Sequence, residues 1–188
     1  MAWRRRSTAR TRIRRVIDWA AFILFAGGVT LFIAWLPQKQ VTGDISFLDG
    51  DSIVLSGTEI RLYGIDAPEG RQTCQRANGA DYQCGREASR ALRNLARGKN
   101  ITCSVITKDR YARNVSKCKA GNVDLNHEMV RLGWAIAYRS HSQDYARAEA
   151  EARTAKRGVW QGRFKRPQDW RHERATAATT TRDKPQPD

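Results

Sequence analysis

The most informative segment, residues 49–69, reads DGDSIVLSGTEIRLYGIDAPE and alternates apolar residues with acids and one arginine. Apolar residues also alternate within residues 45–47 and 53–55, on either side of Asp49-Gly50-Asp51. Alternation on both sides of a glycine-containing turn predicts a β-hairpin. Residues 60–64 continue the pattern and predict a third strand.

The charged residues of this segment occupy defined faces of the predicted strands. Asp51 has the parity of Ile53, so it leans toward the core at the mouth of the sheet, and Asp66 ends the third strand beside that mouth. Two carboxylates could therefore meet at one hard cation, and calcium suits such an irregular oxygen set better than magnesium. Arg61 has the opposite parity to Leu62 and could reach a phosphate. Taken singly, each residue also has an ordinary role in a turn or on a solvated surface.

The rest of the central region predicts two more strands and three helices. Residues 101–107 and 114–119 form a hairpin around Asp109-Arg110-Tyr111-Ala112. Apolar spacing and capping residues predict helices at residues 85–97, 124–133 and 143–157. We therefore expect an α+β domain over residues 41–170, built on a five-stranded OB-type β-barrel with three helices.

All four cysteines lie in this domain, which favours an oxidising compartment. Four cysteines allow three pairings. In the predicted hairpin Cys103 and Cys118 stand opposite each other, so they form one disulfide and leave Cys74 and Cys84 for the second. Zinc is the alternative, but the chain has no CxxC pair and its three histidines share no ligand spacing with the cysteines.

The N-terminus has the pattern of a membrane anchor. Residues 1–15 hold seven arginines and no acid, and residues 19–36 are uncharged, about 27 Å as a helix. We predict a cytoplasmic basic arm at 1–15 and one transmembrane helix, a signal anchor, at 16–37, with the later domain periplasmic or extracellular. A cleaved signal peptide and secretion is the alternative.

Charge and composition describe the remainder of the chain. The formal net charge is +15, and basic residues outnumber acidic ones in the central domain, so we expect polyanions such as nucleic acid as partners. Residues 171–188 are polar and threonine-rich, which predicts a disordered tail. We expect a monomer.

Four motifs in order, DGD, RLYGIDAPE, DRYAR and LGWA, make residues 41–160 resemble the staphylococcal nuclease (thermonuclease) family. The resemblance implies a barrel that holds Ca²⁺ through Asp51, Asp66 and the main-chain carbonyl of Ala67, with Asp49 in support. Two departures from the family stand out: Ala112 replaces a usual glycine, and a cysteine-closed insertion follows Glu69.

The same resemblance assigns the remaining roles. Glu69 would orient or deprotonate the attacking water, while Arg61 and Arg113 would hold the phosphate and offset its developing charge. Arg110, Tyr111 and Tyr138 would contact nucleic acid, where aromatic rings can stack on bases.

The sequence thus predicts a membrane-tethered, calcium-dependent phosphodiesterase, an endonuclease acting on DNA, RNA or both. One alternative is a non-catalytic OB-fold module that binds nucleic acid on a membrane anchor. Another is a tethered interaction protein whose basic face docks on an acidic partner.

Overall fold

The computed structural model describes residues 18–25, 27, 40–140 and 142–182. The chain divides into two compact units, Met1–Gln38 and Lys39–Asp188, and each is described by itself. In the first unit residues 18–25 are helical, and the large apolar side chains Trp19, Phe22, Ile23, Leu24 and Phe25 are all exposed.

The predicted anchor at 16–37 falls largely outside the described residues, as does the basic arm at 1–15. Within the described ranges, no helix combines the length and the apolar character needed to cross a membrane.

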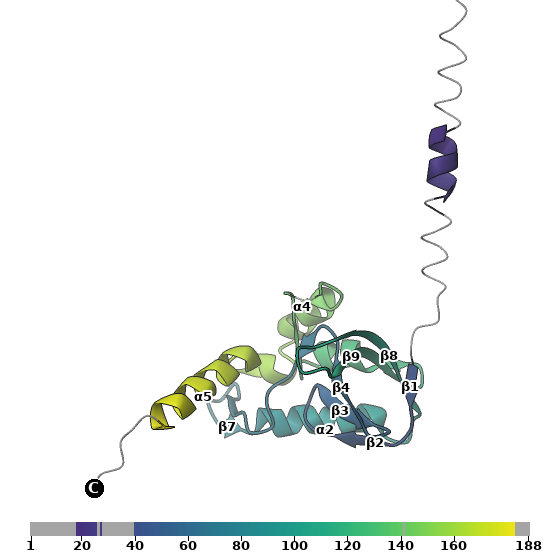
Figure 1. Ribbon diagram of the computed structural model, residues 1–188. Helices are drawn as coiled ribbons and strands as arrows, with labels where there is room; N and C mark the ends of the chain where they lie inside the picture. The colour runs from purple at the N-terminus through teal and green to yellow at the C-terminus, as the bar shows by residue number, and fades with distance from the viewer. Residues whose placement is uncertain (1–17, 26, 28–39, 141, 183–188) are drawn as a thin grey trace, which may run out of the picture. The chain divides into compact units, whose positions relative to one another are not determined.

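The second unit is built on one curled sheet (Figure 1). Its strands are β1 (Gln40–Thr42), β2 (Ile45–Phe47), β3 (Ser52–Leu55), β4 (Thr58–Leu62), β8 (Ile101–Lys108), β9 (Asn114–Ala120) and β10 (Val123–Asp124). The strand order is β1-β8-β9-β4-β3-β2, with β10 on β9; β4 and β9 are parallel and the other pairs antiparallel. All five strands that the sequence predicts are present.

The sheet curls because residues 40–47 supply a strand to each of its two edges. β1 pairs with β8, while β2, only two residues further along the chain, pairs with β3 at the other edge. Gly43, with φ of 136°, lies between them in a backbone conformation that favours glycine. This arrangement is consistent with the predicted OB-type barrel.

The three predicted helices are also present; the first is shifted by one residue at the same length, and the other two are shorter than expected. They are α2 (Cys84–Ala96), α3 (Leu125–Arg131) and α4 (Ala146–Thr154). Asp124 caps α3 as predicted, since its carboxylate accepts a hydrogen bond from the backbone N–H of His127 at 2.9 Å. The inner face of α2 buries Ala88 and Leu92 in the main core.

Both predicted disulfides are present, Cys74–Cys84 and Cys103–Cys118. Cys103 pairs with Cys118 across β8 and β9 as the hairpin predicts, but a bulge between Val105 and Thr107 then moves the register by one residue. Thr107 therefore stands opposite Val115, where a regular hairpin predicts Asn114. Alternation of polar and apolar residues does not reveal a single inserted residue.

The predicted disordered tail at 171–188 is wrong in part, because helix α5 spans Pro167–Arg182. Residues 183–188 lie outside the described part. Proline at the first helical position and Asp169 in the first turn favour a helix start here. Composition alone predicts disorder here, but residues 163–165, just before the helix, form hydrogen bonds with Gln72 and Gln75 of the cysteine-closed insertion. Such tertiary contacts cannot be read from composition.

The insertion after Glu69 forms a second, small core. β6 (Cys74–Gln75) and β7 (Asp81–Tyr82) make a two-stranded ribbon next to the Cys74–Cys84 disulfide. The 3₁₀ helix η1 (Gly158–Gln161) brings Val159 and Trp160 against this core, as the sequence allows after α4 ends. Figure 1 shows α5 leaving the body of the second unit beside β7.

Candidate active site

Asp51 lies immediately before β3, in a turn whose glycine is needed for close packing. The Asp51 N–H donates to Asp49 Oδ1 at 3.0 Å. A Cβ on Gly50 would lie 2.7 Å from Ala88 Cβ of α2 and 2.8 Å from Ala67 Cβ. The glycine in DGD therefore lets helix α2 and the chain at residue 67 pack against the turn that carries Asp51.

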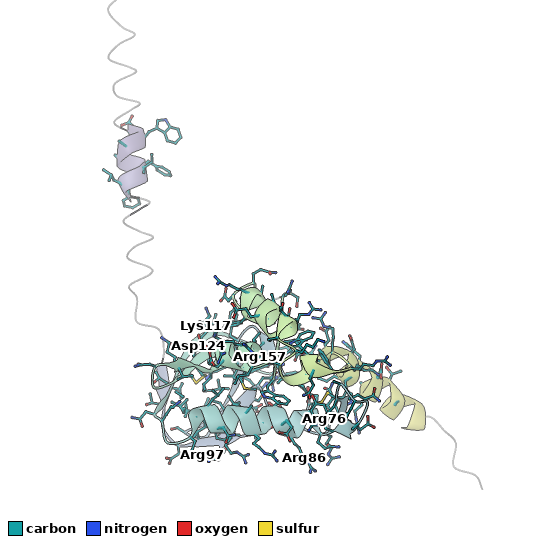
Figure 2. All side chains as sticks on the ribbon, turned by 180° about the vertical axis from the view of Figure 1, so that it is seen from behind. Arg76, Arg86, Arg97, Lys117, Asp124 and Arg157 are labelled. Atoms are coloured by element: carbon teal, nitrogen blue, oxygen red, sulfur yellow. A yellow bond between two sulfur atoms is a disulfide. The ribbon has the colours of Figure 1, made fainter. Side chains whose placement is uncertain are left out.

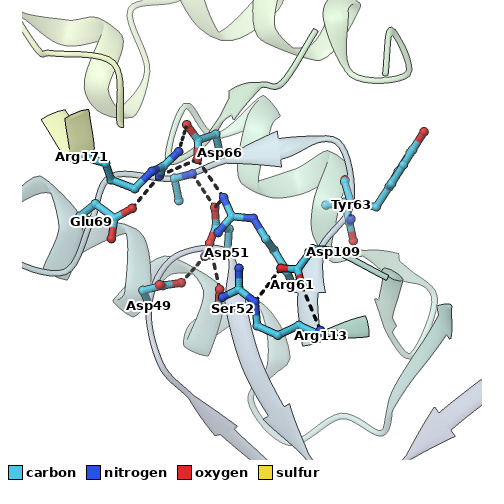
Figure 3. Close-up of polar contacts among 12 residues, drawn as sticks. Asp49, Asp51, Ser52, Arg61, Tyr63, Asp66, Glu69, Asp109, Arg113 and Arg171 are labelled. Atoms are coloured by element: carbon cyan, nitrogen blue, oxygen red, sulfur yellow. Dashed lines mark hydrogen bonds and ion pairs between the residues drawn. The ribbon is translucent and has the colours of Figure 1, made fainter. Parts of the chain in front are cut away.

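Asp51 and Asp66 meet at one guanidinium group, as their predicted positions require. Arg61 Nη2 donates to Asp51 Oδ2 at 3.0 Å and to Asp66 Oδ1 at 2.9 Å (Figure 3). Both aspartates are buried, with 3% and 1% of their surface exposed. Asp66 is held in place by β5 (Ile65–Asp66), which pairs with β11 (Ile136–Ala137).

The remaining contacts of Asp51 fix its orientation. Ser52 Oγ donates to Asp51 Oδ1 at 3.1 Å, and the Ala67 N–H donates to Asp51 Oδ2 at 3.0 Å. Arg61 itself comes from β4, where Ile60 and Leu62 point into the core and the side chain of Arg61 is 19% exposed. The predicted parity of Arg61 is confirmed.

Several carboxyl groups are crowded together at this site. Burial, followed by repulsion from Asp51, raises the pKa of Asp49 from 3.8 to about 7. Burial also raises the pKa of Asp66, against the lowering effect of its contact with Arg171. An additional cation would therefore be favoured here.

Glu69 is held in the loop after β5 by the buried side chain of Gln72. Gln72 Oε1 accepts from the Glu69 N–H at 3.2 Å, and the Gln72 N–H donates to the Glu69 carbonyl at 2.7 Å. Gly85 at the start of α2 adjoins this loop so closely that a Cβ would lie 1.7 Å from the Glu69 carbonyl oxygen.

Arg171, from α5, is a site residue that sequence reasoning missed. Its Nη1 donates to Glu69 Oε1 at 2.6 Å and to Asp66 Oδ1 at 3.0 Å, and its Nη2 donates to Asp66 Oδ2 at 3.2 Å (Figure 3). Burial acts to lower the pKa of Arg171, but the hydrogen bonds and charges of Asp66 and Glu69 together raise it overall. No motif singles this arginine out, because its role depends on where α5 docks.

Arg113 does not contact the central carboxylates but pairs with two other acids. Its Nε donates to Asp109 Oδ2 at 2.7 Å, and its Nη1 donates to Glu59 Oε1 at 3.0 Å. Glu59 lies two residues before Arg61 on β4, so both point to the same side of the sheet. The structure therefore places Arg113 on the same face of the sheet as Arg61, beside Glu59.

The turn before Arg113 carries the predicted nucleic-acid contacts. Tyr111 is 64% exposed, and Arg110 lies over its ring at 4.9 Å. A pocket of about 310 Å³ is bordered by this turn, with Tyr111 and Arg113 among its lining residues. Tyr138 lies elsewhere, at the end of β11, where its N–H donates to the Gly64 carbonyl at 2.9 Å.

The predicted calcium ligands are only partly assembled. Among the described residues, no three or more His, Cys, Asp or Glu side chains are grouped so as to hold a metal ion. Asp51 and Asp66 do accept hydrogen bonds from the same nitrogen, Nη2 of Arg61. The Arg61 guanidinium therefore lies where the two carboxylates would attract a metal cation. Two such carboxylates fit a hard ion that completes its shell with backbone carbonyls, water and phosphate oxygens.

Charge around the second unit is widely spread. Figure 2 shows Arg86 on α2, Arg97 at the C-terminal end of α2 and Arg76 on the insertion, and all three are exposed. Such a surface attracts polyanions in general and does not by itself mark one binding groove.

The curled, barrel-like sheet, with buried aspartates, a nearby glutamate and arginines at one end, is consistent with an OB-type domain. Comparison with known families agrees, because the model for "Staphylococcal nuclease homologue" matches residues 59–162. The chain belongs to this family, and the resemblance of its motifs is confirmed.

Individual relatives are similar over much of the same region. The chain is 34% identical over 125 residues to the succinoglycan biosynthesis protein ExoI of Rhizobium meliloti (strain 1021), covering 65% of each chain. It is 30% identical over 168 residues to the probable staphylococcal-like nuclease CAN1 of Oryza sativa subsp. japonica, covering 88% of this chain and 45% of that protein. An uncharacterized endonuclease of Escherichia coli O157:H7 is 34% identical over 136 residues, 68% of this chain and 82% of that one. The chain thus spans less than two thirds of the length of ExoI and CAN1.

Proposed function

We propose that this protein is a calcium-dependent endonuclease that hydrolyses phosphodiester bonds of DNA, RNA or both. The observation that carries the proposal is the meeting of Asp51 and Asp66 at the Arg61 guanidinium, with Glu69 joined to Asp66 through Arg171. Relatives with similar sequences bear the names nuclease and endonuclease, which supports the same reaction class.

Each step of hydrolysis has a candidate group. Glu69 takes a proton from the attacking water, and Arg61 stabilises the charge that develops on the phosphoryl oxygens. Arg113, on the same face as Arg61, binds a phosphate of the nucleic-acid substrate. Asp51 and Asp66, with the Ala67 carbonyl and Asp49 in support, would hold Ca²⁺, which supplies positive charge to the phosphoryl oxygens when bound.

The nucleic-acid strand lies, in this proposal, across the face that carries Arg61 and the turn at 109–113. The exposed ring of Tyr111 suits stacking on an unpaired base, and the neighbouring Arg110 suits a phosphate. Tyr138, beside Gly64, is the third proposed contact. A substrate with single-stranded character fits this arrangement best.

The experiment incubates the full chain, purified in detergent, with single-stranded DNA and with RNA, in the presence of calcium or of a chelator. We expect internal cleavage with calcium and none with chelator. Glu69→Gln should lower the cleavage rate about 10²–10⁴-fold, because it removes a group that acts in the transition state.

Glu87→Gln is the matched control, since it makes the same chemical change at a glutamate of α2 that pairs with Arg90. It should cleave at the wild-type rate. Binding of nucleic acid without cleavage would favour the alternative, a non-catalytic OB-fold module. An unchanged cleavage rate in Glu69→Gln would show that Glu69 is not the general base.

We also propose that the first unit tethers the protein to a membrane, with the nuclease domain exported to the periplasm or outside the cell. The arginines at 1–15, the uncharged run at 19–36 and the exposed apolar side chains of residues 18–25 support this proposal. Two disulfides in the second unit support an oxidising compartment. Alkaline extraction of isolated membranes tests it: the chain should stay in the pellet, and release into the supernatant would contradict the anchor.

A further inference from the structure

Arg171 occupies the carboxylate oxygens that the proposed reaction needs. It contacts both oxygens of Asp66, at 3.0 and 3.2 Å, and Oε1 of Glu69 at 2.6 Å. Asp66 is a proposed calcium ligand and Glu69 the proposed base. One side chain thus covers a metal ligand and the base together.

Arg171 reaches the site from a segment that is anchored elsewhere. Gln75 and Arg163 exchange two backbone hydrogen bonds, at 2.8 and 3.1 Å, and Gln72 Nε2 donates to the Lys165 carbonyl at 2.7 Å. Lys165 in turn pairs with Glu173 on α5. These contacts tie the segment before α5 and its first turns to the cysteine-closed insertion, and among the described side chains of α5 it is Arg171 that contacts Asp66 and Glu69.

A guanidinium group and a divalent cation exclude each other at these oxygens. Arg61 Nη2 shares Asp66 Oδ1 with Arg171, so calcium would also have to shift Arg61, but only Arg171 covers Asp66 Oδ2 and Glu69 Oε1 as well. Calcium coordination places its oxygen ligands at about 2.3–2.6 Å and uses the lone pairs that now accept hydrogen bonds from Arg171. The two positive charges would also repel at short range. The side chain of Arg171 is 35% exposed, so it can leave toward solvent without unfolding a core.

We propose that α5 is an inhibitory segment in which Arg171 serves as an internal cation that calcium must displace. This inference rests on the proposed function, because it concerns the same carboxylates. Coupling between two cations at one site is reciprocal. Arg171 therefore weakens calcium binding, and bound calcium loosens α5.

The first test titrates calcium into the full chain in detergent, by calorimetry, for the wild type, Arg171→Gln and Arg174→Gln. Arg174 is the matched control, because it lies on the same helix, stacks on Trp170 and carries the same charge. We expect calcium to bind Arg171→Gln about 10-fold more tightly than the wild type, and Arg174→Gln to bind like the wild type.

Arg171→Lys separates charge from geometry. A lysine keeps the charge but loses the planar fork that reaches Asp66 and Glu69 together. Its calcium affinity should lie between those of the wild type and Arg171→Gln. Circular dichroism of each variant checks that the fold is retained.

The second test follows amide hydrogen exchange in residues 167–177. In the wild type, calcium should speed exchange in α5, whereas in Arg171→Gln exchange should already be fast without calcium. Protection that calcium leaves unchanged in the wild type would overturn the inference.

The outcomes distinguish the two proposals. If neither the wild type nor any Arg171 variant binds calcium, the calcium proposal fails and the inhibitory role fails with it. If the wild type binds calcium and Arg171→Gln binds it equally or more weakly, only the inhibitory role is overturned, and Arg171 is then a supporting part of the site.

Discussion

Ala112 has a backbone conformation that an alanine rarely adopts. Its φ is 62°, and its N–H donates to the Asp109 carbonyl at 3.0 Å within the turn before β9. The left-handed region costs a non-glycine residue about 1–2 kcal/mol. The turn keeps this conformation because the Asp109 carboxylate also accepts from the N–H groups of Tyr111 and Arg113, at 2.9 and 3.0 Å.

Replacing Ala112 by glycine should therefore stabilise the protein. We expect a gain of about 0.5–1 kcal/mol in the free energy of unfolding, since the relief of strain exceeds the extra entropy of the unfolded chain. Chemical denaturation measures it. Ala77 is the control, because it is an exposed turn residue whose φ is not positive. Ala77→Gly should be neutral or destabilising. A loss of stability in Ala112→Gly would show that the turn at Ala112 is unstrained.

Asp109 should make the stability of this turn depend on pH. Burial acts to raise the pKa of Asp109, but hydrogen bonds from the side chain and backbone of Arg113 and from the Tyr111 N–H lower it overall. A carboxyl whose pKa is lower in the folded state stabilises the fold above its unfolded pKa, near 3.8. That stabilisation is lost as the pH falls through the folded value.

Asp109→Asn should consequently be less stable than the wild type by about 1 kcal/mol at pH 7, and the difference should shrink below about pH 4. Denaturation at a series of pH values measures the gap. A difference that stays constant down to about pH 2 would mean that the charge of Asp109 contributes nothing.

The residues that could be placed from sequence are those governed by strand parity. Arg61 lies where alternation along β4 puts it, and Asp51 is buried like Ile53, as its parity predicts. Asp66 was predicted to end the third strand, but it belongs to the separate strand β5, which pairs with β11 and has both of its residues buried. The role of Arg171 could not be predicted from sequence, because it depends on how α5 packs against the loop that carries Asp66 and Glu69. The ion pair of Arg113 with Asp109 is local to one turn, whereas its pair with Glu59 depends on the parallel pairing of β4 and β9, which local periodicity does not encode.

At the scale of elements, α3 is joined to the sheet by one buried amide. Asn126 is fully buried, and its Oδ1 accepts from the Cys118 N–H at 2.9 Å. Its Nδ2 donates to the carbonyls of Tyr63, at 2.9 Å, and Ser116, at 3.1 Å. A single side chain thus connects the helix to β9 and to the loop between β4 and β5.

Removing this amide should loosen the contact between α3 and the sheet. Asn126→Ala removes the acceptor of the buried Cys118 N–H and the donor to two backbone carbonyls, and we expect a loss of about 2–4 kcal/mol in the free energy of unfolding. Thermal or urea unfolding measures it. The nearby helix residue His127, whose side chain is 44% exposed, gives a control: His127→Ala should change stability far less.

Elements were predictable where the local sequence specifies them. The five predicted strands and three helices follow from periodicity and capping, whereas β6 and β7 have two residues each and form only where partners meet. The bulge in β8 and the helical part of the tail were missed because both depend on contacts outside their own segment.

At the scale of the whole molecule, two disulfides serve two cores. Cys103 and Cys118 lie in the main core between β8 and β9, and Cys74 and Cys84 lie in the small core of the insertion. Their sequence separations are 15 and 10 residues, so each closes a short loop worth about 2–4 kcal/mol.

Reductant should lower the melting temperature of the second unit. The paired variants Cys74→Ser with Cys84→Ser and Cys103→Ser with Cys118→Ser separate the two contributions. We expect the first pair mainly to release the insertion and speed hydrogen exchange in α5, and the second pair to lower the global melting temperature. A melting temperature unaffected by reductant, with free thiols detected, would contradict both bridges.

The site extends beyond the part of the chain that matches the family model. The match covers 59–162, whereas Asp49 and Asp51 precede it and Arg171 follows it. An expression fragment trimmed to the match would lack β1 to β3, uncover the edge of β4 and lose two of the clustered acids. Such a clone would be expected to aggregate, and its inactivity would be an artefact of truncation with no bearing on catalysis.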